Sequence, residues 1–343
     1  MAHTIVKPQK LVDAAVVLLD REVVVPNLFV KRGVDDFKGT ASDTLTMRVP
    51  GVLPGRDYAW RNDRSTPIVF DEYAEKTLNV SFGGHAYSAV HLTDEQWDFD
   101  LQGDFGRLLE AQARAVGRKL EMAAVNELET APYEVVIGGA EADPSAAFVE
   151  ARRVLNRFNV GQNRVILLGS DFDALLQNDE SFNLASNVGD ANANSALKDA
   201  QIGRWKGMNI ITSNEIDPGA AYVFVPDAFV FLNAAPSAQR GQDNTASASF
   251  NGVALRWIND YDTNYLRDRS VLSTYYGFDT VKDVVRHWNP DGSPAQEAVT
   301  DDEYFVRAVK VTLGGTSTYP EADSELALAT GVSAASGGEG EGE

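Results

Sequence analysis

One segment, residues 104–129, constrains the fold more than any other part of the sequence. Its apolar residues recur every three or four positions, as they do along one face of an α-helix. They are Phe105, Leu108, Leu109, Ala113, Val116, Leu120, Ala124 and Leu128, and Pro132 follows as a stop. At about 1.5 Å per residue, such a helix is a rod of roughly 40 Å. That is long for a globular domain, so we expect a chain organised around an extended helix.

Charge and composition exclude several classes of function. The 343 residues include 30 Lys and Arg against 50 Asp and Glu, a formal net charge of -20. This negative charge argues against a general nucleic-acid binder, which needs clustered cations. It also argues against a protein that docks on an anionic membrane. The absence of cysteine excludes disulfides, thiolate metal sites and cysteine nucleophiles. We find no apolar stretch of membrane-spanning length and no signal-peptide pattern in Met1–Lys10, and expect a soluble protein.

The N-terminal segment is unusually apolar. Residues 8–19 read as a short helix, with Pro8 tolerated in its first turn, and Val23–Val25 follow before Pro26. A terminus of this kind must dock on something. Two alternatives stay open: it packs on the core of its own chain, or it packs on a neighbour.

Residues 40–85 predict a long two-stranded excursion. Thr44–Val49 alternates apolar and polar side chains, and so does the run that contains Leu78, Val80 and Phe82. Within the polar stretch between them, residues 51–67 carry the charged residues Arg56, Asp57, Arg61, Asp63 and Arg64. A lone two-stranded ribbon is marginal in water, so either the body of the chain or another chain must support it.

The remainder predicts a mixed α/β unit followed by late strands. Asp143 and Pro144 mark a capped helix start, Val165–Leu168 is a buried strand, and Ser170 caps a further helix. Strands are expected at Met208–Thr212, Tyr222–Val225, Phe250–Ile258, Val271–Tyr276 and Tyr304–Leu313. Residues 316–343 hold six acidic residues and no basic one, which predicts a disordered acidic tail. The fold class is α+β.

The sequence contains little that points to catalysis. His85 and His91 are six residues apart in a strand pattern, so they share a face about 20 Å apart and cannot share a metal. Asp171 and Asp173 lie in the first turn of a predicted helix, where they complement its dipole. The pair Asp260 and Asp262 lacks the rest of a calcium loop. None of the common nucleotide, metalloprotease or serine-hydrolase motifs occurs. We therefore expect no catalytic residues, no cofactor and no metal.

Three segments together resemble a known family. Residues 88–95 (SAVHLTDE) precede the long helix, residues 197–214 (LKDAQIGRWKGMNIITSN) contain two glycines suited to a tight turn before a strand, and residues 252–256 (GVALR) are followed by the acidic run at 260–262. In this order, over roughly residues 5–315, they resemble the major capsid (coat) proteins of tailed bacteriophages, with the Hong Kong-type capsid fold. The detail is most similar to the non-crosslinked coat-protein branch.

The resemblance implies an organisation of the chain. Residues 1–39 would be the N-terminal arm and 40–85 the extended β E-loop. The ranges 86–132 and 250–314 would form the peripheral domain with the spine helix, and 133–249 the axial domain. Residues 315–343 have no counterpart in the family and would be the acidic disordered tail. The segment 178–200 is too short for the folded insertion that some members of this branch carry.

The resemblance also implies a function and partners. The chain would be a structural subunit that self-assembles, as hexamers and pentamers, into an icosahedral head enclosing double-stranded DNA. Scaffold, portal and decoration proteins would be partners, and DNA would be contacted without sequence specificity. The head would be assembled in the host cytoplasm and become part of the virion. Acidic groups that face inward would repel the packaged DNA. Interface candidates are Leu11, Val12 and Val16 of the arm, with Arg56, Asp57, Arg61, Asp63 and Arg64 of the loop.

Three alternatives remain at this stage. A nanocompartment shell uses the same fold, but its cargo-binding logic is not visible in the sequence. A surface-layer subunit or adhesin would also self-associate, although it would normally carry a secretion signal. A carboxylate-dependent hydrolase would need a cleft with paired acids, for which Asp260 and Asp262 are the candidates.

Overall fold

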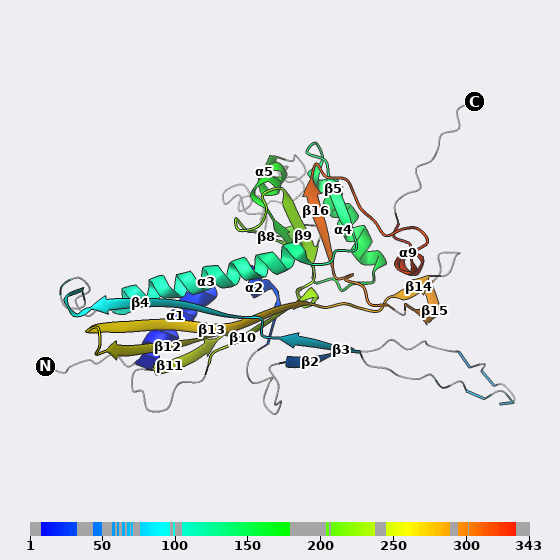
Figure 1. Ribbon diagram of the computed structural model, residues 1–343. Helices are drawn as coiled ribbons and strands as arrows, with labels where there is room; N and C mark the ends of the chain where they lie inside the picture. Colours follow the sequence, from blue (N-terminus) through cyan, green and yellow to red (C-terminus); the bar gives the residue numbers. More distant parts are fainter. Residues whose placement is uncertain are drawn as a thin grey trace. The chain divides into compact units, whose positions relative to one another are not determined.

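The structure is a computed structural model, which describes residues 8–32, 44–49, 76–96, 105–178, 204–205, 207–236, 245–288, 294–300 and 302–333, with scattered positions between 57 and 70 and at 99. The chain forms two compact units (Figure 1). Unit 1 comprises Met1–Met47, Leu78–Ala131 and Phe229–Thr280, and unit 2 comprises Arg48–Thr77, Pro132–Ala228 and Val281–Glu343.

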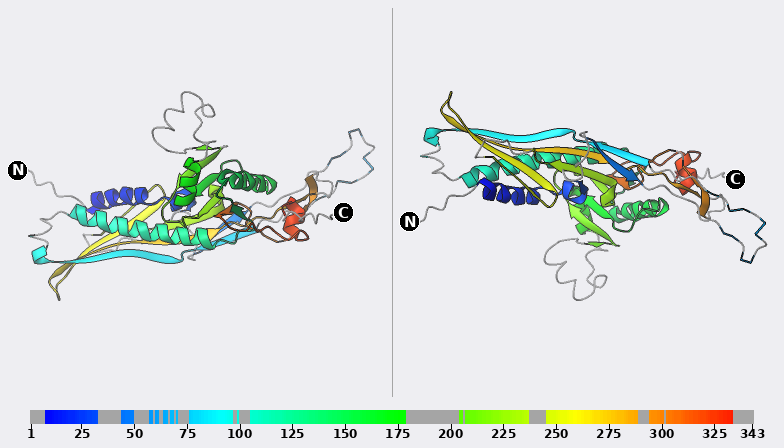
Figure 2. Two further views of the ribbon diagram at one scale, coloured as in Figure 1. Left: turned by 90° about the horizontal axis from the view of Figure 1, so that it is seen from above. Right: turned by 90° about the horizontal axis from the view of Figure 1, so that it is seen from below.

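Unit 1 is a twisted sheet covered by helices. The sheet order is β1 (Val30–Arg32), β10 (Phe229–Ala234), β13 (Arg267–Thr280), β12 (Val253–Asp262) and β11 (Thr245–Phe250), and β4 (Gly84–Thr93) also pairs with β13. The helices are α1 (Pro8–Glu22), α2 (Val25–Leu28) and α3 (Phe105–Thr130). Helix α3 packs on β13 and β4, and α1 lies beside α3 (Figure 2). The separate strands β2 (Thr44–Val49) and β3 (Lys76–Ser81) pair with each other.

The long helix is confirmed almost to the residue. Helix α3 buries Leu109, Ala113, Val116, Leu120, Ala124 and Leu128, which are six of the eight apolar residues of the predicted face. A buried polar group, Gln112, sits among them. Its amide Nε2 donates to the backbone carbonyls of Ser88 on β4 at 3.2 Å and Ser270 on β13 at 3.0 Å. Its Oε1 accepts from the Ser270 hydroxyl at 2.8 Å, so Gln112 fixes where the helix sits on the sheet.

Unit 2 is built on a second mixed sheet. Its order is β5 (Val136–Gly139), β16 (Ala308–Leu313), β9 (Ala220–Phe224), β6 (Val165–Leu168), β8 (Met208–Thr212) and β7 (Arg204–Trp205). Helices α4 (Pro144–Arg157), α5 (Ser170–Asn178) and α9 (Glu325–Thr330) accompany it, with a 3-10 turn η3 (Pro226–Ala228) and the two-stranded sheet of β14 (Arg286–Trp288) and β15 (Pro294–Val299). The predicted start of α4 is confirmed, because the Asp143 side chain accepts the Ala146 N–H at 3.1 Å and Pro144 opens the helix.

The prediction of a disordered tail is wrong for residues 316–333. Thr318 exchanges two backbone hydrogen bonds with Val136. Ser324 caps α9, because its hydroxyl accepts the Ala327 N–H at 3.2 Å. Leu326, Ala329 and Val332 of this segment are buried in the core of unit 2. The tail was predicted from its acidic composition, and the apolar residues that recur every three positions within it were not recognised as a helix signal. Residues 334–343 lie outside the described residues.

The predicted domain boundaries also differ from the two units. Residues 229–249 were assigned to the axial domain, but β10 pairs with β13 in unit 1. Residues 281–314 were assigned to the peripheral domain, but β16 pairs with β9 and β5 in unit 2. No strand is predicted over the residues of β10, and even where periodicity locates a strand, as for β16, it carries no information about which sheet that strand joins. The predicted E-loop, 40–85, is divided between the two units.

Candidate assembly surfaces

The N-terminal arm packs on its own unit. Val12, Val16 and Leu19 on one face of α1 are fully buried, and α1 contacts α3, β11 and β12. A Cβ atom at Gly117 of α3 would lie 3.0 Å from Leu19 Cδ1, so the glycine permits the close helix crossing. Of the two alternatives for the arm, Val12 and Val16 therefore fit the first, the core of their own chain. Leu11 is only partly buried.

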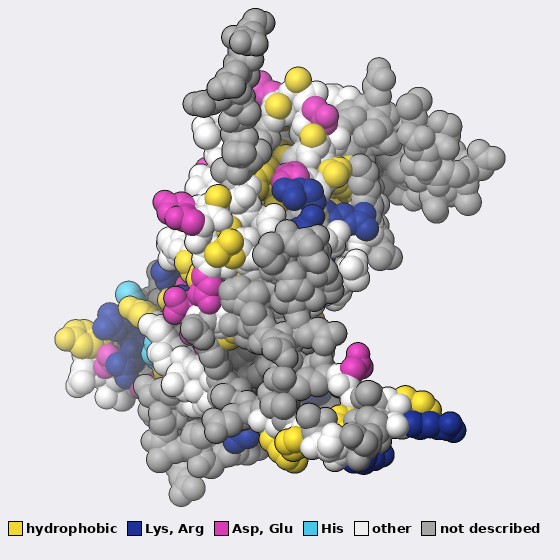
Figure 3. All heavy atoms as spheres, turned by 90° about the vertical axis from the view of Figure 1, so that its right-hand side faces the viewer, with side chains coloured by type: hydrophobic (Ala, Val, Ile, Leu, Met, Phe, Trp, Pro, Cys, Tyr) yellow, Lys and Arg dark blue, Asp and Glu magenta, His cyan; other side chains and the backbone are white. Residues whose placement is uncertain are grey.

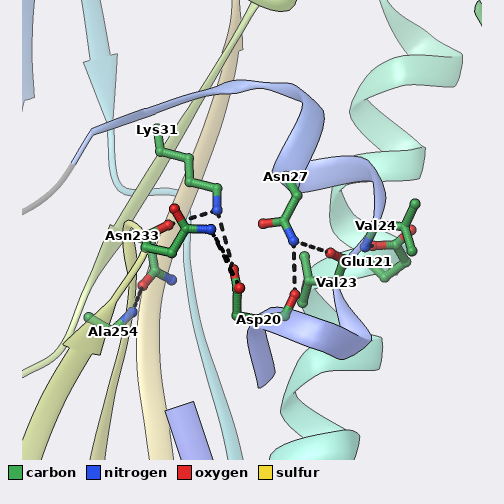
Figure 4. Close-up of polar contacts among 9 residues, drawn as sticks. Asp20, Val23, Val24, Asn27, Lys31, Glu121, Asn233 and Ala254 are labelled. Atoms are coloured by element: carbon green, nitrogen blue, oxygen red, sulfur yellow. Dashed lines mark hydrogen bonds and ion pairs between the residues drawn. The ribbon is translucent and has the colours of Figure 1, made fainter. Parts of the chain in front are cut away.

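A buried carboxylate on α3 holds the turn that follows α1. Glu121 is 4% exposed, and its oxygens accept the backbone N–H groups of Val24 at 2.9 Å and Val25 at 3.0 and 3.1 Å (Figure 4). These N–H groups open the short helix α2, where backbone donors have no partner within the helix. Asn27 adds hydrogen bonds from its side-chain amide to the carbonyls of Val23 and Asp20. We call Glu121 and the two N–H groups it binds the arm latch.

A second polar cluster ties the arm to the β11–β12 hairpin. Lys31 Nζ donates to the Asn251 carbonyl at 2.7 Å and lies 3.5 Å from Asp20 Oδ1, while Asn251 Nδ2 donates to the same carboxylate at 3.2 Å (Figure 4). Asn251 and Gly252 have φ of 49° and 76°, as a tight two-residue hairpin turn requires. Burial lowers the pKa of Lys31, and Asp20 opposes that shift. The hairpin turn is thus held by residues on both sides of α2.

A buried amide joins three strands next to this cluster. Asn233 of β10 accepts the Ala254 N–H through Oδ1 (Figure 4). Its Nδ2 also donates to Thr274 Oγ1 at 3.0 Å. Strands β10 and β12 both pair with β13, one after the other along its length. Asn233 therefore links the end of β10 to the start of β12.

The loop residues predicted as interface candidates are only partly described. Asp57, Arg61 and Arg64 are exposed, whereas Arg56 and Asp63 lie outside the described residues. Arg61 and Arg64 both have a φ of 56°, which is uncommon for residues other than glycine. The Arg64 guanidinium lies 5.9 Å from the centre of the Tyr58 ring.

The same stretch exposes large apolar side chains that the sequence analysis passed over. Trp60 is 88% exposed and Phe70 is 91% exposed, and Ile68 is also mostly exposed. Three such side chains within eleven residues of a polar loop are a signal of a contact surface, since exposed apolar clusters mark interaction sites. We call Trp60, Ile68 and Phe70 the apolar loop residues.

Along β4, exposed residues alternate with more buried ones, and the exposed side of the strand carries aromatic and polar side chains. His85, Tyr87 and His91 of β4 are exposed, which confirms that the two histidines share a face. The His85 ring lies 4.6 Å from the Tyr275 ring of β13. Burial and the nearby Arg256 lower the pKa of His85, which favours the neutral ring.

The paired acids of β12 are engaged in ion pairs. Asp260 pairs with Arg269 at 2.5 Å, and Asp262 lies 3.4 Å from Arg269 and 3.9 Å from Arg267 across the β12–β13 hairpin. Opposite charges at facing strand positions stabilise a hairpin. Asp171 and Asp173 lie in the first turn of α5, as predicted. Within the described residues there is no group of three His, Asp or Glu side chains placed to hold a metal.

Side chains of different kinds are interspersed on the face drawn in Figure 3, where apolar, acidic and basic groups alternate among the described atoms. Such mixing is common to ordinary protein surfaces and to many interfaces, so this face is not singled out as a contact surface by its composition.

The comparisons with known proteins identify the family. A family model described as phage capsid protein matches residues 87–270, more than half of the chain. The chain belongs to the phage capsid protein family. The matched range includes α3, strands β10, β11 and β12, and the part of β4 from residue 87 onward.

Solved capsid structures share the fold. A structure from Mycobacterium phage Che8 is 14% identical with a TM-score of 0.55, covering 84% of this chain and 90% of its own. The capsid of the cyanophage P-SCSP1u is 9% identical with a TM-score of 0.60, covering 86% and 89%. The mature capsid of bacteriophage PhiM1 is 10% identical with a TM-score of 0.55, covering 85% and 87%. No curated protein sequence matches the chain significantly.

As a phage capsid protein with the α+β Hong Kong-type fold, the chain has a structural, capsid-forming role. It is a virion component, and its family and fold are those of a structural protein. None of the helices in the described part of the chain is both long and apolar enough to cross a membrane.

Proposed function

We propose that this chain is the major capsid protein of an icosahedral phage head that encloses double-stranded DNA. Copies would form hexamers and pentamers through heterologous contacts that adapt to slightly different neighbours. Scaffold, portal and decoration proteins would be further partners, and assembly would take place in the host cytoplasm. The protein would act without catalytic residues, cofactor or metal.

The observation that carries this proposal is the exposure of the apolar loop residues. Trp60 and Phe70 leave nearly all of their surface to water in the single chain. Large aromatic side chains are the usual anchors of protein interfaces, because burying each one in a partner removes much apolar area from water. We therefore infer that the loop between β2 and β3 docks on another copy, with Asp57, Arg61 and Arg64 as its polar rim.

The test compares shell formation by loop variants. The double variant W60A/F70A should fold normally, because the lost side chains are exposed, but it should give at least tenfold fewer shells by electron microscopy. L328A removes a 58% exposed leucine of α9 and serves as a control with unchanged shell yield. The charge reversal R61E should weaken assembly in the same direction while leaving the monomer folded. Normal shell yield from W60A/F70A and R61E would contradict the assignment of the loop as an interface.

A further inference from the structure

The turn between β11 and β12 places an asparagine before a glycine that the fold requires. Asn251 and Gly252 have φ of 49° and 76°, in the left-handed region that asparagine and glycine adopt most readily. A Cβ atom at position 252 would lie 2.8 Å from Lys31 Cδ and 3.0 Å from its Cβ. Backbone geometry and the close approach of Lys31 therefore both call for glycine after Asn251. We call these two residues the asparagine–glycine turn.

This dipeptide is chemically reactive. The Gly252 backbone nitrogen can attack Cγ of Asn251, because glycine has no Cβ to block the approach and both groups belong to one chain. A bond forms between Gly252 N and Asn251 Cγ while the bond from Cγ to Nδ2 breaks, and Nδ2 leaves as ammonia with the proton of the attacking nitrogen. Water then opens the cyclic imide to aspartate or isoaspartate. Both residues are exposed, so water reaches the turn.

The N-terminal arm restrains the side chain that has to react. Asn251 Nδ2 donates to Asp20 Oδ1 at 3.2 Å and to Asp20 Oδ2 at 3.4 Å. Rotation of the amide toward Gly252 N breaks these charge-assisted contacts, and an anionic acceptor at Nδ2 opposes the loss of that nitrogen. Asp20 is itself held, because its side chain is 16% exposed and lies 3.5 Å from Lys31 Nζ (Figure 4).

A second contact keeps the arm on the same hairpin. Gln9 of α1 donates through Nε2 to the Ser247 carbonyl of β11 at 3.2 Å. Lys31 Nζ donates to the Asn251 carbonyl at 2.7 Å on the other side of α2. The restraint on Asn251 therefore depends on the docked position of the whole arm, from α1 to β1.

We propose that Asn251 is a site of spontaneous deamidation whose rate is set by docking of the N-terminal arm. While the arm is docked, Asp20 holds the amide and the turn reacts slowly. When the arm leaves, the turn reacts as an unrestrained asparagine–glycine pair. The product places a second carboxylate beside Asp20, and Lys31 then faces two acids. The modified chain holds its arm less tightly, so the reaction is a one-way switch. This inference goes beyond the capsid-forming role and does not depend on it.

The test follows conversion of Asn251 in the purified full-length chain by peptide mass spectrometry during incubation at mildly alkaline pH. D20A should raise the rate by about tenfold or more, because the lost hydrogen bonds are bonds to a charged group. D13A is the matched control, since it removes an exposed acid from the same helix, where the carboxylate accepts from Gln9 Nε2 at 3.0 Å. Its rate should equal that of the wild type.

Two further variants cover the case in which D20A does not fold, and they test the product. D20N keeps an acceptor oxygen for the Asn251 amide and should react at a rate between those of the wild type and D20A. N251D reproduces the product, whereas N251G removes the side chain without adding charge and suits the left-handed backbone. Limited proteolysis between residues 20 and 30 should be faster in N251D than in N251G.

Three results would overturn the inference. Absence of conversion in every variant would show that the turn is not a modification site. Equal rates in the wild type and both Asp20 variants, or an equal acceleration in D13A, would show that Asp20 does not restrain the amide. Equal proteolysis of N251D and N251G would show that the product does not loosen the arm.

Discussion

Glu121 Oε1 accepts the backbone N–H of Val25 at 3.0 Å, and this contact joins two parts of the chain that are 96 residues apart in the sequence. It places the N-terminal arm on the long helix of its own subunit. The arm could equally have packed on a neighbour, to judge from its apolar residues alone. The buried carboxylate favours the arrangement within one chain, because it would lose its donors if α2 moved away.

The arm latch should contribute measurably to stability. E121A leaves two backbone N–H groups without their carboxylate and opens a cavity, so we expect a loss of about 2–4 kcal/mol in the free energy of unfolding. E121Q retains one acceptor oxygen and should lose less. Urea denaturation of the unassembled chain measures both values, and limited proteolysis should show faster cleavage between residues 20 and 30 in E121A. Wild-type stability in E121A would contradict the latch.

The position of α3 on its sheet should depend on Gln112. Q112A removes three hydrogen bonds from a buried site, and S270A removes one of the same set together with the bond that Trp257 Nε1 makes at 2.9 Å. Residues within one network lose stability non-additively. A double-mutant cycle on the free energy of unfolding should therefore give a coupling of about 1 kcal/mol. Strict additivity would mean that the two side chains act independently.

The folded C-terminal segment provides a deletion test. Removal of residues 317–343 takes away α9 and the buried Leu326, Ala329 and Val332, so unit 2 should lose several kcal/mol of stability or fail to fold. Removal of residues 334–343 leaves these contacts in place and should change the melting temperature by less than about 2 °C. Equal melting temperatures for the two deletions would show that α9 contributes nothing.

Stability should also depend on pH through Glu127. Burial, and then the nearby Asp279, raise the pKa of Glu127. An acid whose pKa is higher in the folded state favours folding when it is protonated, so its stabilising effect is present at low pH and is lost as the pH rises through the folded pKa. E127Q keeps the side chain neutral and should be more stable than the wild type at pH 7, with the difference vanishing below about pH 4.

The matched control for this experiment is E129Q, two residues further along α3, where the side chain is exposed. Both substitutions remove an acid from the last turn of the helix, so both relieve the same unfavourable interaction with the helix dipole. The stabilisation at pH 7 should therefore be larger in E127Q than in E129Q. Equal effects would assign the gain to the dipole and not to burial.

Sequence patterns predicted individual helices and strands better than they predicted which unit each element joins. The long helix and the start of α4 followed from periodicity and from the pair Asp143–Pro144, because both signals are local. The domain boundaries at residues 229–249 and 281–314 differ from the two units, since the sheets that β10 and β16 join depend on contacts far apart in the sequence. The tail was misjudged because its acids outweighed three apolar residues in composition. Glu121 resembled any other surface acid of a helix until its partners were known.

For the candidate assembly surfaces, too, the sequence predicted some of the contact residues and missed others. Charged residues drew attention to the loop, and Arg61 and Arg64 are indeed exposed. The apolar loop residues were overlooked, although Trp60 and Phe70 stand in a polar stretch where an aromatic side chain has no local core to join. Val12 and Val16 satisfied the pattern of an interface, yet they are buried within their own unit.

The most direct test is negative-stain electron microscopy of the purified full-length chain, alone and co-expressed with the proteins encoded beside it. The capsid account predicts closed shells tens of nanometres across under at least one of these conditions. A discrete monomer or small oligomer under both conditions would contradict it.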